Sequence, residues 1–155
     1  MTIDLEAICD ALALRFEPAT IGTPTGAPAM REVYPEPPKS VPIVPSVLLE
    51  VQDGTVVANP GQWKHEINID VMFLLSKRQA DPIRVETNRR KWLPRLLTAT
   101  TGQLKLGLGS ASGYSVDKAI AVGWEFTEFD VADATFDAIR VRYVAYVTET
   151  VSLTP

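Results

Sequence analysis

A long alternation of apolar and polar residues in the middle of the chain restricts the possible folds most strongly. Within residues 64–75, every second position from 67 onward is apolar: Ile67, Ile69, Val71, Phe73 and Leu75. A period of two places successive side chains on opposite faces of a β-strand, so the pattern predicts a strand with one face on a core. Met72 and Leu74 make the other face apolar near the end, which predicts that this half is covered on both sides.

Three further segments alternate in the same way. Residues 46–52 form one of them, and Asp53-Gly54 directly after it is typical of a turn. We therefore expect this strand to pair with the strand 64–75 across a loop at 53–63. The other two segments, 119–126 and 139–148, are separated by VADATFD, which predicts an antiparallel hairpin.

Two segments have helical periodicity. Residues 2–16 carry an apolar stripe at helical spacing, with Thr2 or Asp4 as a cap and Pro18 beyond the end. Asp81-Pro82 predicts the start of a second helix, which we expect to run to about Thr98. Pro94 lies inside it, and a proline costs about 3 kcal/mol in a helix interior, so we expect a kink or a break there.

Two irregular segments complete the chain. Residues 18–45 hold eight of the 12 prolines, which predicts an extended loop with at most a short edge strand at 30–34. Residues 100–117 contain four glycines and predict a flexible connection. The expected fold is α+β in one domain, 1–155, with 22–45 and 100–117 as extended loops. A single mainly antiparallel sheet carries two helices on one face, in the order α-(β)-β-β-α-β-β.

The composition excludes several classes of protein. The net charge of −4 disfavours a non-specific DNA-binding domain, which needs an excess of basic residues. No apolar run reaches the roughly 18 residues that a membrane span requires, and Asp4 and Glu6 are unlike a basic secretory leader. We therefore expect a protein without membrane contact, kept in a reducing compartment.

The sequence contains no recognisable catalytic motif. His65 is the single histidine and Cys9 the single cysteine, so a catalytic triad or a zinc site has few candidate residues. Gly107, Gly109 and Gly113 lack the strand-turn-helix context of a phosphate loop. We expect no enzyme activity, no metal and no cofactor.

A basic cluster lies on the predicted second helix: Arg84, Arg89, Arg90, Lys91 and Arg95. The simpler interpretation is that these residues form the solvent-exposed face of an amphipathic helix. The alternative is a contact with an acidic partner, which Arg140 and Arg142 would extend if the fold brings them near.

The layout as a whole resembles the tail terminator family of long-tailed bacteriophages. The resemblance covers most of the chain, in the order LEAICDALALRF, PIVPSVLLEVQ, HEINIDVMFLLS, ADPIRVETNRRKWLPRLL, AIAVGWEFTEFD and FDAIRVRYVAYVTETV. It implies a structural virion protein, assembled in the bacterial host cytoplasm. Such a protein forms a homo-oligomeric ring, usually of six subunits, on the end of the tail tube. The ring stops tube polymerisation and receives the head.

The resemblance also implies a set of partners: further copies of the chain, the tail tube protein, and the head-tail connector or head-completion protein. DNA would pass through the ring without sequence-specific binding, which an acidic surface suits. We expect the interface to use the basic cluster and the two loops. The expected residues are Arg84, Arg89, Arg90, Lys91, Arg95, Tyr34, Pro37, Pro38, Leu106, Leu108 and Tyr114.

Three other functions remain open at this point. A head-completion or connector protein of the neck would have much the same sequence pattern. A small cytoplasmic binding module, or an enzyme whose substrate supplies a reacting group, would need a deep pocket with convergent polar groups. A tail-tube subunit would have a larger share of β-structure and no second long helix.

Overall fold

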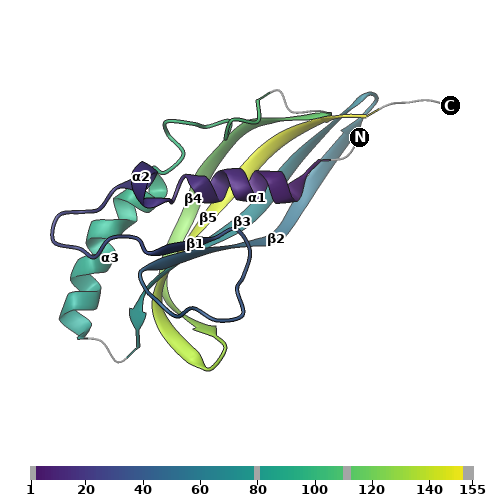
Figure 1. Cartoon of the computed structure of the whole chain (residues 1–155). Helices are drawn as coiled ribbons and strands as arrows, with labels where there is room; N and C mark the ends of the chain where they lie inside the picture. Colours follow the sequence, from purple (N-terminus) through teal and green to yellow (C-terminus); the bar gives the residue numbers. More distant parts are fainter. Residues whose placement is uncertain (1–2, 79–80, 110–112, 152–155) are drawn as a thin grey trace.

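The computed structural model describes residues 3–78, 81–109 and 113–151. They form one five-stranded sheet with the strand order β1-β2-β3-β5-β4, together with three helices (Figure 1). In chain order the elements are α1 (Leu5–Leu14), α2 (Pro18–Ile21), β1 (Glu32–Tyr34), β2 (Ser46–Asn59), β3 (Gln62–Lys77), α3 (Pro82–Leu97), β4 (Tyr114–Val131) and β5 (Ala134–Thr150). The α+β class is confirmed. The sheet is mixed, because β1 pairs parallel with β2 while the other neighbours are antiparallel.

The first helix begins and ends close to the predicted positions. Asp4 caps α1 by accepting a hydrogen bond from the Ala7 backbone N–H at 3.0 Å. The other candidate cap, Thr2, lies outside the described residues. Phe16 follows the helix end and is fully buried, and Pro18 begins the short helix α2, which the sequence reasoning missed.

The expected loop at 53–63 is wrong, because both strands continue through it. β2 and β3 stay paired as far as Asn59 and Gln62, and the turn lies at residues 60–61. Asp53-Gly54 instead follows a β-bulge, which absorbs an extra residue without ending the strand. A Cβ on Gly54 would come within 2.9 Å of the Glu66 carbonyl oxygen, so the close approach of the two strands favours glycine there.

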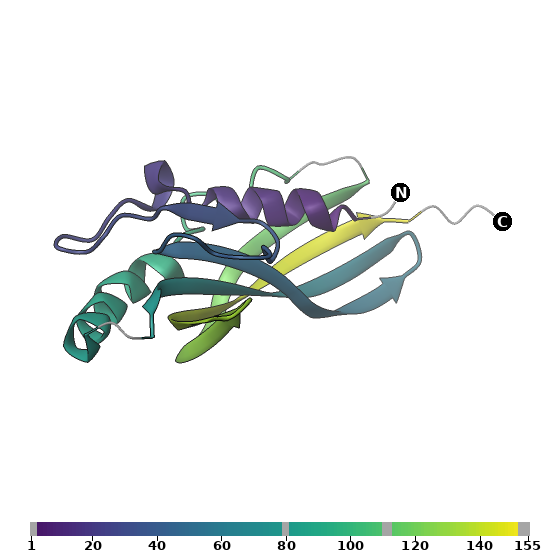
Figure 2. The same cartoon turned by 60° about the horizontal axis from the view of Figure 1, so that its bottom comes forward.

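The closing hairpin is confirmed and is longer than predicted. β4 begins at Tyr114, within the segment expected to be a flexible connection, and residues 110–112 of that segment lie outside the described part. β4 and β5 pair until Val131 and Ala134, so most of VADATFD is strand and only residues 132–133 turn. Figures 1 and 2 show the tip of the β2–β3 hairpin at the opposite end of the molecule from α3.

The third helix runs without a break through Pro94. The Asp81 carboxylate accepts a hydrogen bond from the Ile83 backbone N–H at 3.0 Å and begins the helix as expected. Pro94 lies on the exposed side in the last turn, and its carbonyl still accepts from the Thr98 N–H at 3.2 Å. The expected break does not occur, because the missing proline N–H falls near the helix end on the face turned to solvent.

Helices α1 and α3 pack on the same face of the sheet, as predicted. Their buried residues, among them Leu12 and Trp92, share one cluster with Ile69, Val71 and Tyr143 of the central strands. A second cluster lies on the opposite face, where Val41 of the proline-rich segment packs against residues at the strand ends. Its buried members are Val41, Leu48, Met72, Leu74, Val131, Phe136 and Ala138. Coverage of β3 on both sides at its end is therefore confirmed.

Tyr143 connects the sheet to α3, and it makes the free energy of unfolding decrease at alkaline pH. Its buried hydroxyl donates a hydrogen bond to the Leu96 carbonyl, and burial raises the pKa of Tyr143 well above its ordinary value. An unfolded tyrosine ionises near pH 10, so above that pH ionisation favours the unfolded chain. We expect the free energy of unfolding contributed by Tyr143 to fall by about 1.4 kcal/mol per pH unit above pH 10.

Tyr143→Phe removes this pH-dependent component. Urea unfolding of both proteins between pH 8.5 and about 11 measures it. The native protein should be more stable than the variant at pH 8.5, and this advantage should shrink as the pH rises above about 10. An advantage that stays constant over this range would contradict the assignment. The other tyrosines are common to both proteins and cancel in the comparison.

Candidate functional site

The sheet ends in two free edges of different character. β1 pairs only with residues 46–48, and Pro35 directly after it has no N–H to continue the pairing. Within the described residues, nothing pairs with the outer side of β2 from Leu49 onward, or with the outer side of β4 over most of its length. Free edges present rows of unpaired N–H and C=O groups that favour pairing with another strand.

Both free edges carry exposed apolar side chains. On β2 these are Val51, Val56 and Val57, and on β4 they are Val122 and Trp124. Part of β4 is shielded, since the Val116 and Ala119 N–H groups donate to carbonyls of the preceding loop. Natural proteins usually protect an edge with charged residues or prolines. The run from Thr55 to Ala58 has neither, so this edge is open to a partner strand.

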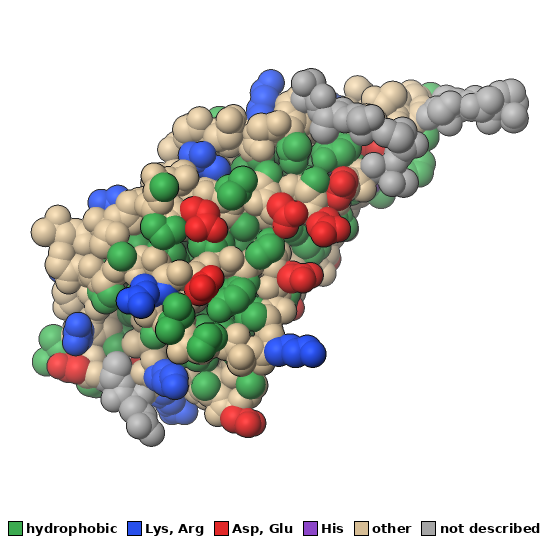
Figure 3. All heavy atoms as spheres, in the orientation of Figure 1, with side chains coloured by type: hydrophobic (Ala, Val, Ile, Leu, Met, Phe, Trp, Pro, Cys, Tyr) green, Lys and Arg blue, Asp and Glu red, His purple; other side chains and the backbone are tan. Residues whose placement is uncertain are grey.

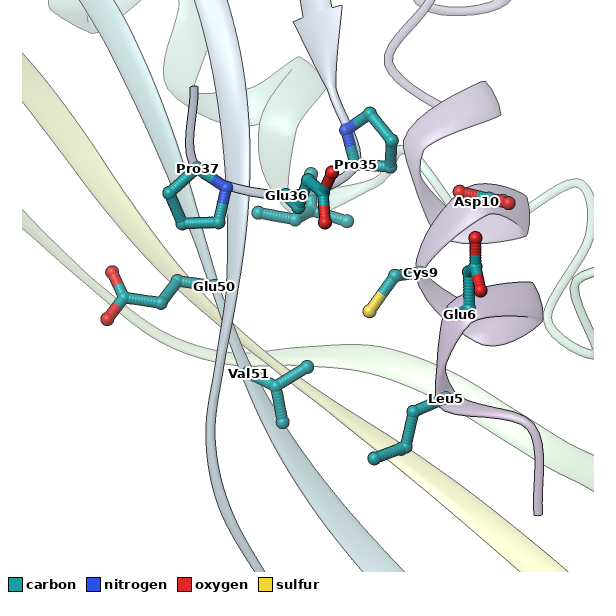
Figure 4. Close-up of a pocket in the computed structure, with 10 residues that line it drawn as sticks. Leu5, Glu6, Cys9, Asp10, Pro35, Glu36, Pro37, Glu50 and Val51 are labelled. Atoms are coloured by element: carbon teal, nitrogen blue, oxygen red, sulfur yellow. The ribbon is translucent and has the colours of Figure 1, made fainter. Parts of the chain in front are cut away.

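A groove of about 520 Å³ lies beside the β2 edge, between α1 and the chain that follows β1 (Figure 4). Its floor is apolar, formed by Leu5, Cys9, Leu49 and Val51. Figure 4 shows the Cys9 sulfur directed into the groove, with Val51 across from it and Pro35, Glu36 and Pro37 crossing one end from the α1 side to the β2 side. The groove exists because the prolines turn the chain away from β2 after three paired residues.

Four acidic residues line the groove: Glu6, Asp10, Glu36 and Glu50. Figure 4 shows the Glu50 side chain directed away from Cys9, so Glu6, Asp10 and Glu36 are the carboxylates beside the apolar floor. None of them forms an ion pair with a Lys, Arg or His of the described chain. Burial raises the pKa of the Cys9 thiol, and the neighbouring Asp10 carboxylate raises it further. Acidic side chains gather over α1 and the strand edge beside it, while basic side chains gather mostly toward α3 (Figure 3). The charges on this surface are therefore separated, with acidic side chains near α1 and most basic side chains toward α3.

The structure divides the predicted basic cluster into two groups. Arg89 and Arg95 point into the molecule: Arg89 donates to the carbonyls of Thr127 and Ala138, and Arg95 to that of Ile21. Arg84, Arg90 and Lys91 are exposed. Arg140 and Arg142 do not extend the cluster, because they lie on the opposite face of the sheet, where Asp70 pairs with both.

The predicted loop residues are also divided. Leu106 and Tyr114 lie in the core rather than at the surface, and Leu108 is half-buried against it. Tyr34 packs against the second core cluster. Pro37 is exposed on the groove wall, and Pro38 beside it is half-buried. Of the residues expected at an interface, only Pro37 lines the acidic groove.

Sequence reasoning missed the four groove carboxylates. Glu6 and Asp10 are spaced by four residues on the polar face of a predicted helix, so the sequence alone predicts that they are neighbours. Glu36 and Glu50 come from the proline segment and from a strand, and nothing in the sequence links them to α1. His65 lies elsewhere, with its Nε2 3.7 Å from a carboxylate oxygen of the buried Glu149.

The described residues lack two further features, a metal-binding cluster and a membrane-spanning helix. Over residues 3–78, 81–109 and 113–151, no three His, Cys, Asp or Glu side chains converge as a metal site would require. None of the helices in the described part of the chain has both the length and the apolar character needed to cross a membrane. Neither a comparison with protein-family models nor one with curated proteins gives a match.

Proposed function

We propose that the chain is a non-enzymatic structural protein that closes into a ring, and that it acts as the tail terminator of a long-tailed bacteriophage. One observation carries the proposal: a single sheet ends in two different free edges, β2 and β4, on opposite sides of the molecule. A head-to-tail ring needs two unlike complementary surfaces on each subunit. Pairing the β2 edge of one copy with the β4 edge of the next meets that requirement.

The proposed role follows from such a ring. The ring would sit on the last layer of the tail tube, stop its growth and offer its other side to the head-tail connector. The net charge of −4 suits a channel through which DNA slides without adhering. The virion is the corresponding location, and the ring size expected from the resemblance is six.

Electron microscopy of phage particles lacking this gene tests the role. We expect overlong tails of variable length without attached heads, since nothing would stop tube growth. Tails of normal length beside unattached heads would instead assign the protein to the connector side of the neck. Intact, infectious particles would contradict any role in the neck and favour the binding-module alternative.

Complementation of the same deletion tests the β2 edge. A gene carrying Val57→Lys places a charge on the free edge, where it opposes strand pairing. We expect this variant to leave the tails overlong. Leu14→Lys is the matched control, because Leu14 is equally exposed, at 62% against 61%, but it is the last residue of α1 and belongs neither to an edge strand nor to the groove lining. Rescue by both variants would contradict edge pairing.

A further inference from the structure

The exposed face of α3 is complementary to the acidic groove, because it carries an exposed apolar side chain and basic residues. Ile83 is 78% exposed in the first turn of α3, and it is flanked by Arg84. Arg90 and Lys91 are also exposed and lie about two turns later. This face therefore presents an apolar side chain among three cations, of which Arg90 is paired with Glu86 at 3.0 Å. Asp81, at the start of the helix, caps the Ile83 N–H.

We propose that the acidic groove binds the exposed α3 face of a neighbouring copy of this chain. The apolar floor of Leu5, Leu49 and Val51 would receive Ile83, and the surrounding carboxylates would receive Arg84 and Lys91. Burial of apolar area supplies the affinity, and opposite charges set the orientation and the choice of partner. This contact rests on the proposed ring and assigns a second interface to it.

The same contact cannot form within one subunit. α1 packs over β1 and β2, whereas α3 packs over β3, β4 and β5. The groove lies at the first turns of α1, and Figure 1 shows the first turn of α3 at the far end of the molecule. An α3 face that reaches a groove must therefore belong to another copy, which makes the contact head-to-tail.

The sheet geometry supports the same arrangement. Both helices lie on one face of the sheet, with α1 near the β2 edge and α3 nearer the β4 edge. Joining β2 of one copy to β4 of the next continues the sheet across the boundary. That continuation brings α3 of the next copy to the side where α1 borders the groove. Edge pairing and groove binding are therefore compatible in one interface.

A charge-swap experiment tests the contact. The groove variant carries Glu6→Lys and Asp10→Lys, and the helix variant carries Arg84→Glu and Lys91→Glu. Self-association of full-length protein is measured by sedimentation velocity at low salt, with circular dichroism to monitor folding. Each variant alone should associate at least about tenfold more weakly than the native chain, because like charges then face each other. The loss should shrink at high salt.

Mixing the two variants supplies the decisive measurement. In a mixed assembly every basic groove meets an acidic helix and every acidic groove meets a basic helix, so association should return to near the native level. Such rescue also shows that both variants are folded. The matched control carries Asp133→Lys and Glu66→Lys, which make the same charge change on exposed residues away from the groove. This control should associate like the native chain.

The outcomes separate this contact from the proposed function. Native-like association of either reversed variant alone, or absence of rescue on mixing, would overturn the contact while leaving edge pairing in place. A native chain that stays monomeric at every concentration would overturn the contact as well. Failure of the terminator role would appear only in the microscopy of gene-deleted particles, whatever the charge swap shows.

Discussion

Trp92→Ala is expected to lower the free energy of unfolding by about 3–5 kcal/mol, because it removes the largest fully buried side chain that holds α3 on the sheet. The Trp92 ring lies 4.9 Å from that of Phe73 between centroids. A domain is stable by only about 5–15 kcal/mol, so the variant should unfold at much lower urea concentration. Urea unfolding followed by circular dichroism measures the change.

Two controls make this result specific to burial. Trp92→Phe keeps an aromatic ring, and the Trp92 Nε1 has no hydrogen-bond partner among the described residues, so we expect a cost below about 1.5 kcal/mol. Trp124→Ala removes the same side chain from a site that is 52% exposed, and we expect a loss of about 1 kcal/mol or less. Equal losses for Trp92→Ala and Trp124→Ala would contradict the packing of α3.

Arg89→Ala should have the second largest effect, a loss of about 2–3 kcal/mol. The Arg89 guanidinium donates to the Thr127 carbonyl at 3.0 Å and lies 5.2 Å from the centre of the Phe126 ring. Its Nη2 is 3.9 Å from an Asp137 carboxylate oxygen, and both side chains are largely buried. Removing the arginine leaves this carboxylate without its nearby charge and the carbonyl without its donor.

The adjacent arginine is the natural comparison. Arg90 is exposed and makes an i,i+4 pair with Glu86, so Arg90→Ala should change stability by no more than about 0.5 kcal/mol. Chemical denaturation of both variants under identical conditions measures the difference. Comparable losses from the two substitutions would show that the contacts of Arg89 with β4 and β5 contribute little to stability.

These two arginines show why charge alone did not define the candidate site. Both belong to one basic cluster in the sequence, yet α3 directs Arg89 toward the sheet and Arg90 toward solvent. Of the cluster, only Arg84, Arg90 and Lys91 are exposed and could form a basic contact surface. The groove that we propose as its counterpart includes one residue that the sequence reasoning had selected, Pro37.

Local periodicity by itself determined most of the secondary structure. Alternation in residues 64–75, 119–126 and 139–148 identified strands, and Asp81-Pro82 identified the start of α3, because these features depend on near neighbours in the chain. Periodicity also predicted the burial of Met72 and Leu74, since apolar residues on both faces of a strand require cover on both.

Only the tertiary structure decided how far the strands extend and what surrounds the groove. Asp53-Gly54 favours a turn locally, but pairing with β3 keeps this segment in the sheet. The turn therefore lies at residues 60–61. Glu36 lies beside the groove because Pro35 ends the pairing of β1, which also leaves the edge of β2 free from Leu49 onward. The sequence encodes local preference, whereas a free edge and a groove are properties of where strands stop pairing, which depends on partners distant in the chain.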